Sequence, residues 1–146
     1  MSGQLDHSPA RIIRELLIDL SSGTSDLSAD WAIFVNSIPD DPDKVIVIND
    51  TTGVLDGRIM ITGEQLTEHG FQVVIRDQGQ DTGFVRANLI ATTLDIVLRS
   101  SVTIGSSTYL VQAVSRVGDV IYVGTDVPQS NLHLFTINAR TSLCKT

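Results

Sequence analysis

Cysteine and aromatic residues are scarce in this sequence, and each shortage argues against a class of protein. Cys144 is the only cysteine among 146 residues, so no disulfide can form within the chain. Its place close to the end predicts a frayed segment and disfavours a catalytic nucleophile. Aromatic residues make up 5% of the chain, and few of them neighbour a lysine or an arginine. The sequence therefore lacks the alternation of aromatic and basic residues that is typical of proteins that bind single-stranded nucleic acid.

Basic residues and long apolar runs are also few. Ten lysines and arginines stand against 17 aspartates and glutamates, which gives a formal net charge of −7. This charge disfavours nonspecific binding to phosphate backbones, although an acidic surface could border a nucleic acid that has to slide past it. No apolar run reaches the length of a membrane span, and the first residues lack the pattern of a secretion signal. We therefore expect a protein made in the cytoplasm of its cell, without a membrane partner.

Motifs of metal, phosphate and nucleophilic chemistry are missing as well. His7, His69 and His133 lie far apart and form no two-histidine ligand spacing, which disfavours a zinc site. The acidic residues Asp40, Asp41 and Asp43 lack the central glycine and closing glutamate of a calcium loop, so we expect a solvated loop stiffened by proline. Glycines never form a phosphate-binding pattern, and no serine lies in a G-x-S-x-G turn. We predict a protein that is not an enzyme and that has no catalytic residues, cofactor or metal.

The remaining composition is that of one folded domain. Hydrophobic residues make up 42% and charged residues 18% of the chain, which is typical of a globular protein. The length suits a single core, and no repeat or linker divides the chain. We predict one domain over residues 1–146, in which residues 1–7 and 141–146 form flexible tails.

The strongest local pattern is a short buried strand followed by a long helix. Residues 71–75 form a β-branched and aromatic run that is closed by a turn at 76–79. A helix is predicted to begin with an oxygen-bearing cap at residues 81–83 and to run to Arg99. Its broad apolar face consists of Phe84, Ala87, Ile90, Ala91, Leu94, Val97 and Leu98.

A second, narrower apolar stripe lies on nearly the opposite side of this helix and consists of Val85, Leu89 and Ile96. A surface helix of a monomer needs only one apolar stripe. The second stripe must therefore meet another layer of the same chain or another subunit, and the sequence leaves both open. The pair Arg76-Asp77 just before the helix is either a functional pair or a solvated strand end.

The other segments complete a pattern of helix, strands, helix and strands. Residues 8–9, a serine and a proline, open an amphipathic helix that should end near 21–23 with glycine as a left-handed cap. Residues 49–57 are predicted as a long turn region, 58–61 as a weaker extended piece and 62–70 as a mobile polar arm. Further strands are predicted at residues 31–35, 44–48, 102–104, 108–114, 120–123 and 131–139. The fold class is then α+β, a single domain with a mainly antiparallel, mixed β-sheet and two main helices packed on one side.

The order of these segments resembles a known family. Its most specific part is the strand Phe71-Gln72-Val73-Val74-Ile75-Arg76, followed by a helix with Ala87, Ala91 and Leu94. The other segments that carry it are Ile38-Pro39-Asp40-Asp41-Pro42-Asp43-Lys44-Val45-Ile46-Val47-Ile48, Asp50-Thr51-Thr52-Gly53, Asp56-Gly57-Arg58, Gly63-Glu64, Gly124-Thr125-Asp126 and Phe135-Thr136-Ile137-Asn138. Over most of residues 8–140 the chain resembles the small tail-terminator and minor capsid, or head–tail joining, proteins of long-tailed bacteriophages. It departs from the family pattern at residues 131–134, where a basic residue is expected.

The resemblance implies a structural virion protein that forms a homo-oligomeric ring, usually of six subunits. Such a ring lies at the head-proximal end of the tail tube, stops tube polymerisation and provides the head-joining surface. The implied partners are other copies of the chain, the tail tube protein and a head-completion or neck protein. DNA would pass through the channel without specific binding, and the ring would be assembled in the cytoplasm of the host bacterium.

Two sets of candidate contact residues follow from these considerations. The candidates for the subunit interface are Val85, Leu89, Ile96, Arg76 and Asp77. The candidates for contact with the tube or the neck are Asp50, Asp56, Arg58, Glu64 and Glu68. Alternative functions are those of another neck or head-completion protein, such as a stopper or minor capsid protein, and of a monomeric binding module. An unrecognised hydrolase would need acidic residues that converge in one cleft.

Overall fold

The structure is a computed structural model that describes residues 5–21, 23–25, 31–39, 43–58, 60–61, 65–125 and 132–146, with the backbone alone at 55–58 and 65–66. It has two helices and seven strands within these residues. The elements are α1 (Pro9–Asp19), β1 (Ala32–Val35), β2 (Val45–Arg58), β3 (Gln65–Asp77), α2 (Gln80–Asp95), β4 (Leu98–Ile104), β5 (Ser107–Arg116), β6 (Ile121–Thr125) and β7 (His133–Lys145).

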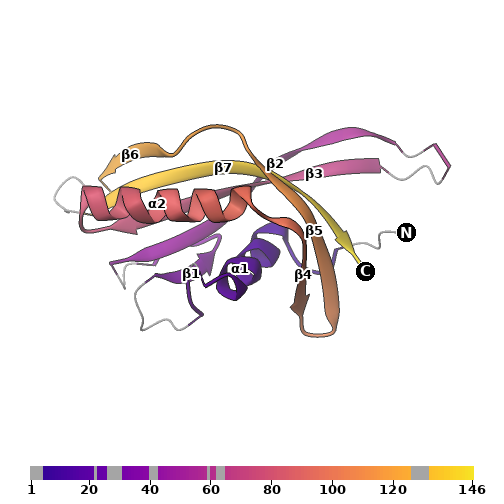
Figure 1. The fold of residues 1–146 in the computed structure, drawn as a ribbon, viewed down its shortest axis with the longest axis horizontal. Coiled ribbons are helices and arrows are strands. Elements are labelled where there is room, and N and C mark those ends of the chain that lie inside the picture. The colour runs from indigo at the N-terminus through magenta and orange to yellow at the C-terminus, as the bar shows by residue number, and fades with distance from the viewer. Residues whose placement is uncertain are drawn as a thin grey trace.

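The strands form one mixed sheet in the order β1-β2-β3-β7-β5-β4, and β6 also pairs with β7. The β1–β2 pair is parallel, and every other pair is antiparallel. Both helices lie on one side of the sheet, where β4 and β5 curl around α1 (Figure 1). The predicted α+β class, with a mainly antiparallel mixed sheet and two helices on one side, is therefore confirmed.

The alternation of side chains along β3 explains how the sheet has two different faces. Phe71, Val73 and Ile75 point to the helices and belong to the main core cluster. Val74 points the other way and joins a small second cluster with Val45 and Val47. One sheet face is thus covered by both helices, while the other face has only a local apolar patch.

Helix α1 begins as the sequence predicts. The Ser8 hydroxyl accepts a hydrogen bond from the backbone N–H of Arg11, and proline occupies the first helical position. The helix ends at Asp19, and Ser21, with φ 62°, takes the left-handed conformation. The expectation that Gly23 would be the left-handed residue is wrong. A Cβ at Gly23 would lie 2.5 Å from the side chain of Ile33, so this glycine instead permits close packing on β1.

Helix α2 differs from its prediction at both ends. It starts at Gln80 with Gly79 as N-cap, and no side chain caps it, so the expected cap at residues 81–83 is wrong. It ends at Asp95 and does not continue to Arg99. Leu98 already pairs with Ala113, because the chain turns there into the β4–β5 hairpin. This pairing satisfies backbone groups that a longer helix would otherwise bond internally.

The predicted turn region at 49–57 is wrong, and so is the predicted loop character of residues 65–70. Residues 45–58 are one long strand, β2, which pairs with β3 through residue pairs such as Thr51–Gly70, Val54–Glu68 and Leu55–Thr67. Residues 60–61 form a turn, and 62–64 lie outside the described residues. Glycine permits the two strands to approach closely here, since a Cβ at Gly53 would lie 2.2 Å from the carbonyl oxygen of Glu68.

The ends of the chain are also more ordered than predicted. Residues 141–145, which we expected in a flexible tail, continue β7 and pair with β5. Near the other end, the Asp6 carboxylate accepts hydrogen bonds from Ser107 and from the ammonium group of Lys145. The His7 ring lies 2.6 Å from the hydroxyl of buried Tyr109. Residues 1–4 of the other predicted tail lie outside the described residues.

The approach of α2 to β7 at Gly83 yields a stability prediction. A Cβ at this position would lie 2.7 Å from a ring carbon of buried Phe135 and 3.1 Å from the Cβ of Asp77. Overpacking of this kind costs about 1–3 kcal/mol, whereas the gain in helix propensity is at most about 1 kcal/mol. Gly83→Ala should therefore lower the midpoint of thermal unfolding by several degrees. Gly118→Ala is the matched control, because nothing lies within 4 Å of its added methyl group, and an equal loss in both variants would contradict this account.

Candidate functional site

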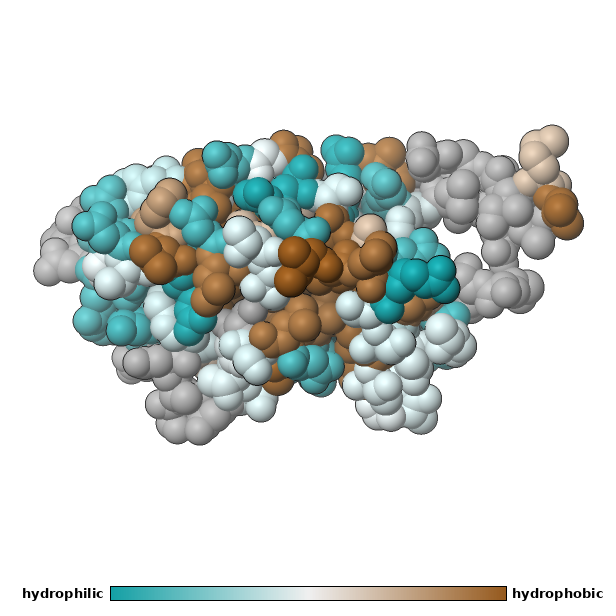
Figure 2. Space-filling view, viewed as in Figure 1, coloured by the Kyte–Doolittle hydropathy of each residue, from teal (hydrophilic) through white to brown (hydrophobic). Residues whose placement is uncertain are grey.

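The outward face of α2 carries an exposed apolar stripe. The second stripe is exposed, with 67% of Val85, 49% of Leu89 and 78% of Ile96 accessible to solvent. Brown, apolar residues accordingly run along α2 in the space-filling view (Figure 2). Of the two partners that the sequence left open for this stripe, a second layer of the same chain is not found among the described elements. Exposed apolar stripes of this kind are typical of surfaces that contact another molecule.

A groove of about 420 Å³ lies beside the first half of α2. Its lining consists of Trp31, Lys44, Asp77, Asp81, Thr82, Val85, Arg86 and Leu89. The guanidinium carbon of Arg86 lies 4.8 Å from the centre of the Trp31 ring, a cation–π arrangement. Burial lowers the pKa of Arg86, and the nearby charge of Asp77 partly opposes that shift. The groove therefore combines apolar walls with charged groups of both signs.

Trp31 is held in an unusual backbone conformation at this groove. Its φ is 64°, in the left-handed region that bulky residues rarely adopt, at a cost of about 1–3 kcal/mol. Its N–H donates to the carbonyl of Lys44, and its carbonyl accepts from Thr24. These bonds hold Trp31 just before β1, and its ring packs against the guanidinium group of Arg86 on α2.

Arg76 and Asp77, two predicted interface residues, are buried and engaged within the subunit. Arg76 is 2% exposed and donates to the backbone carbonyls of Asp43, at 3.0 Å, and Pro39, at 2.7 Å. Asp77 is fully buried and accepts hydrogen bonds from the Thr82 hydroxyl and the N–H of Gln78. The expectation of a solvated strand end is wrong. Both side chains thus serve internal contacts, and their part in a subunit interface stays a prediction.

Four of the residues predicted to contact the tube or the neck, Asp50, Asp56, Arg58 and Glu68, fall on the β2–β3 hairpin. Asp50 lies at its base and accepts hydrogen bonds from the N–H of Ala10, at 2.9 Å, and from the Asn36 side chain, at 3.0 Å. Glu68 is half-exposed farther along β3. The side chains of Asp56 and Arg58 and the whole of Glu64 lie outside the described residues, so these candidates stay predictions.

The hairpin has an apolar tip that the sequence analysis missed. Met60 is 97% exposed and Ile61 is 95% exposed, the highest values among the large apolar residues described. Both lie in the turn between β2 and β3. The signal was the adjacent Met60-Ile61 pair itself, which we assigned to a weak strand. An apolar pair in a turn that no other described element covers is unusual for a monomer.

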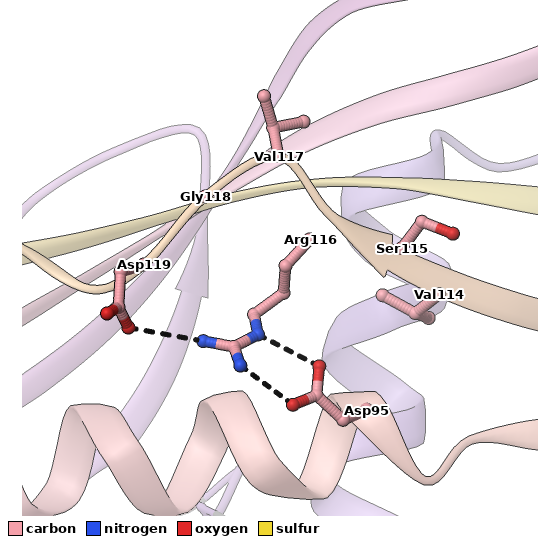
Figure 3. A pocket seen from close by; sticks show the side chains of 7 residues that line it. All are labelled: Asp95, Val114, Ser115, Arg116, Val117, Gly118 and Asp119. Atoms are coloured by element: carbon pink, nitrogen blue, oxygen red, sulfur yellow. Dashed lines mark hydrogen bonds and ion pairs between the residues drawn. The ribbon is translucent and has the colours of Figure 1, made fainter.

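Two further hollows lie elsewhere on the described surface. One, near the end of α2, contains Arg116, which bonds both carboxylate oxygens of Asp95 at 2.9 Å and lies 3.7 Å from Asp119 (Figure 3). Arg116 thereby offsets a negative charge at the C-terminal end of α2, which the helix dipole disfavours. The other hollow, of about 310 Å³, lies at the base of the hairpin beside His69.

Two general findings accompany this geometry. Within the described residues, no cluster of three or more histidines, cysteines, aspartates or glutamates is suited to holding a metal ion. No described helix is long and apolar enough to span a membrane.

Comparison with known protein families identifies the chain. Residues 16–143 match the family described as bacteriophage tail terminator protein. The chain belongs to this tail terminator family. It is thus a structural tail protein of a phage virion, as the order of its segments suggested.

Two other comparisons add little to the family assignment of this tail terminator. A chain of the virion of a native gene transfer agent particle is similar in structure, with 10% identity and a TM-score of 0.46. The match covers 77% of the tail terminator and 78% of that chain, and at this level it carries no functional argument. No curated protein matches the sequence.

We expect the protonation of His69, at the base of the hairpin, to make the stability of the tail terminator depend on pH. Burial lowers the pKa of His69 below its ordinary value of 6.5, and Asp50 partly opposes this shift. The unfolded chain therefore binds the proton first, so the folded state should lose stability as the pH falls below 6.5. An NMR titration should give a midpoint below 6.5 for the His69 ring, and His69→Gln should reduce the acid-induced loss of thermal stability. A midpoint at or above 6.5 would contradict this account.

Proposed function

We propose that the protein forms a homo-oligomeric ring that caps the head-proximal end of the phage tail tube. The ring stops tube polymerisation and provides the surface to which the filled head is joined. Its partners are other copies of itself, the tube protein and a head-completion protein of the neck. The match to the tail terminator family over residues 16–143 is the observation that carries this proposal.

The exposed stripe of α2 supports the ring. A ring closes when two different surfaces of each subunit meet head to tail through a rotation that divides a full turn. Val85, Leu89 and Ile96 supply one such surface, since they are exposed and apolar. The resemblance drawn from the sequence suggests six subunits.

The negative net charge of the chain is compatible with a channel through which DNA passes without binding. With a formal net charge of −7, the subunit tends to repel the DNA backbone, so acidic side chains on the inner wall of a ring would not retard DNA that passes through. This role needs neither a catalytic site nor a cofactor, and we propose that the protein is not an enzyme. The acidic residues of the hairpin, Asp50 and Glu68 among those described, remain the candidates for contact with the tube or the neck.

The α2 stripe can be tested with a single charge. Leu89→Asp should leave a folded subunit, because Leu89 is half-exposed, but should prevent assembly by placing a carboxylate in an apolar contact. Light scattering behind a sizing column, over a range of concentrations and salt, should give a multiple of the subunit mass for the wild type and a monomer for the variant. Val117→Asp is the control, since Val117 is 59% exposed outside the stripe. A ring that persists in Leu89→Asp would count against the stripe.

Purified tail tubes can test the function itself. The wild-type protein should bind one end of each tube and halt its elongation in the presence of excess tube protein, as seen by electron microscopy of tube lengths. Another neck protein would leave elongation unchanged, and a monomeric binding module would show no preference for tube ends. Unchanged tube lengths at saturating protein would refute the proposal.

A further inference from the structure

The β2–β3 hairpin leaves the sheet as a two-stranded arm. The last residue pair between β3 and β7 is His69–Thr141, whereas β2 and β3 continue to pair as far as Arg58–Gln65. The arm projects from one end of the molecule (Figure 1). A two-stranded hairpin without a packed face is only marginally stable in water. Met60 and Ile61 at its turn are nearly fully exposed, and this contact of apolar side chains with water is a further unfavourable contribution to the free energy of the isolated arm.

The groove beside α2 lies at the other end of the same strand. Asp77, the last residue of β3, lines this groove, while the arm begins at the opposite end of β3. The 13 residues of β3 span about 40 Å at 3.3 Å per residue. The arm of one chain therefore cannot reach the groove of the same chain in this fold.

We propose that Met60 and Ile61 at the arm turn of one subunit dock into the α2 groove of the next copy in the ring. The inference rests on the proposed function and identifies the two different surfaces that a head-to-tail contact needs. The donor is a projecting apolar pair, and the acceptor is a groove of about 420 Å³ with Val85 and Leu89 along one side. The two surfaces lie at opposite ends of the subunit, so each copy can donate its arm to one neighbour and accept the arm of another.

The chemistry of the acceptor fits this donor. Trp31 offers an aromatic ring, against which a methionine sulfur packs favourably. Val85 and Leu89 are 67% and 49% exposed and would lose contact with water when the apolar pair docks. Arg86 and Lys44 border the groove and can bond backbone carbonyls of an incoming turn.

Single cysteines in separate chains test the contact. In a Cys144→Ser background, Ile61→Cys and Leu89→Cys would be made in different chains, mixed, and treated with a short bifunctional maleimide. Any link between residues 61 and 89 then joins two subunits, and peptide mass spectrometry identifies it. Ser106→Cys, in the exposed β4–β5 turn, replaces Ile61→Cys in the control mixture. We expect the 61–89 link to form and the 106–89 link to be absent.

A chain that carries both Ile61→Cys and Leu89→Cys distinguishes the geometries. Head-to-tail docking should give a ladder of linked species that ends at the ring mass, whereas reciprocal exchange of arms would stop at a dimer. Met60→Ser with Ile61→Ser should raise the concentration needed for half-assembly by about tenfold or more, and Val117→Ser should leave it unchanged.

The outcomes separate this inference from the function on which it rests. A ring that forms without the 61–89 link, or links that stop at dimers, would overturn arm docking and leave the capping ring in place. A chain that assembles neither alone nor on tube ends would overturn the proposed function and arm docking together. The 61–89 ladder, together with the shift in assembly concentration, would establish the contact.

Discussion

The contact between Gly83 of α2 and Phe135 of β7 fixes which side of α2 faces the sheet. Only a residue without a side chain fits there, and Ala87 and Ala91 continue the small-residue side of the helix along the core. This close approach sets the rotation of α2 about its axis. Because the rotation is set, the stripe of Val85, Leu89 and Ile96 must face outward. The candidate interaction surface is therefore a consequence of how tightly the helix packs.

Arg76 and Asp77, at the end of β3, stabilise the segments that pack on the two faces of the sheet. Arg76 reaches the backbone carbonyls of Pro39 and Asp43, while Asp77 receives the hydroxyl of Thr82 in the first turn of α2. Buried charges are costly unless hydrogen bonds compensate them, and here each is engaged by polar groups of a neighbouring segment. Arg76 and Asp77 thus stabilise the fold: Arg76 binds the segment that contains Pro39, and Asp77 binds the first turn of α2.

One strand also relates the two surfaces that we assign to assembly. The β3 strand begins in the projecting arm and ends at the α2 groove, so its length separates an apolar pair from an apolar recess. The apolar pair and the groove of one subunit therefore cannot contact each other. In the ring that we propose, this separation has a use, because a head-to-tail contact needs two different surfaces on each copy.

The sequence by itself determined the α+β class, both helices, the core strands and the family. These rest on local signals: the serine–proline start of α1, the apolar run of β2 at residues 45–48, and the apolar spacing within α2. It also separated the two stripes of α2, since side-chain periodicity in a helix depends only on backbone geometry.

Only the tertiary structure decided what depends on pairing between distant segments. Residues 49–57 and 62–70 were predicted as a turn region and a mobile arm, yet Gly53 and Gly70 permit a long hairpin, because each lies against the backbone of the opposite strand. Arg76-Asp77 resembled a solvated strand end, but segments distant in sequence bury Arg76 and the packed start of α2 buries Asp77. Local pattern reports which backbone conformation a segment prefers, whereas burial and partnership are set by parts of the chain that the segment meets only after folding.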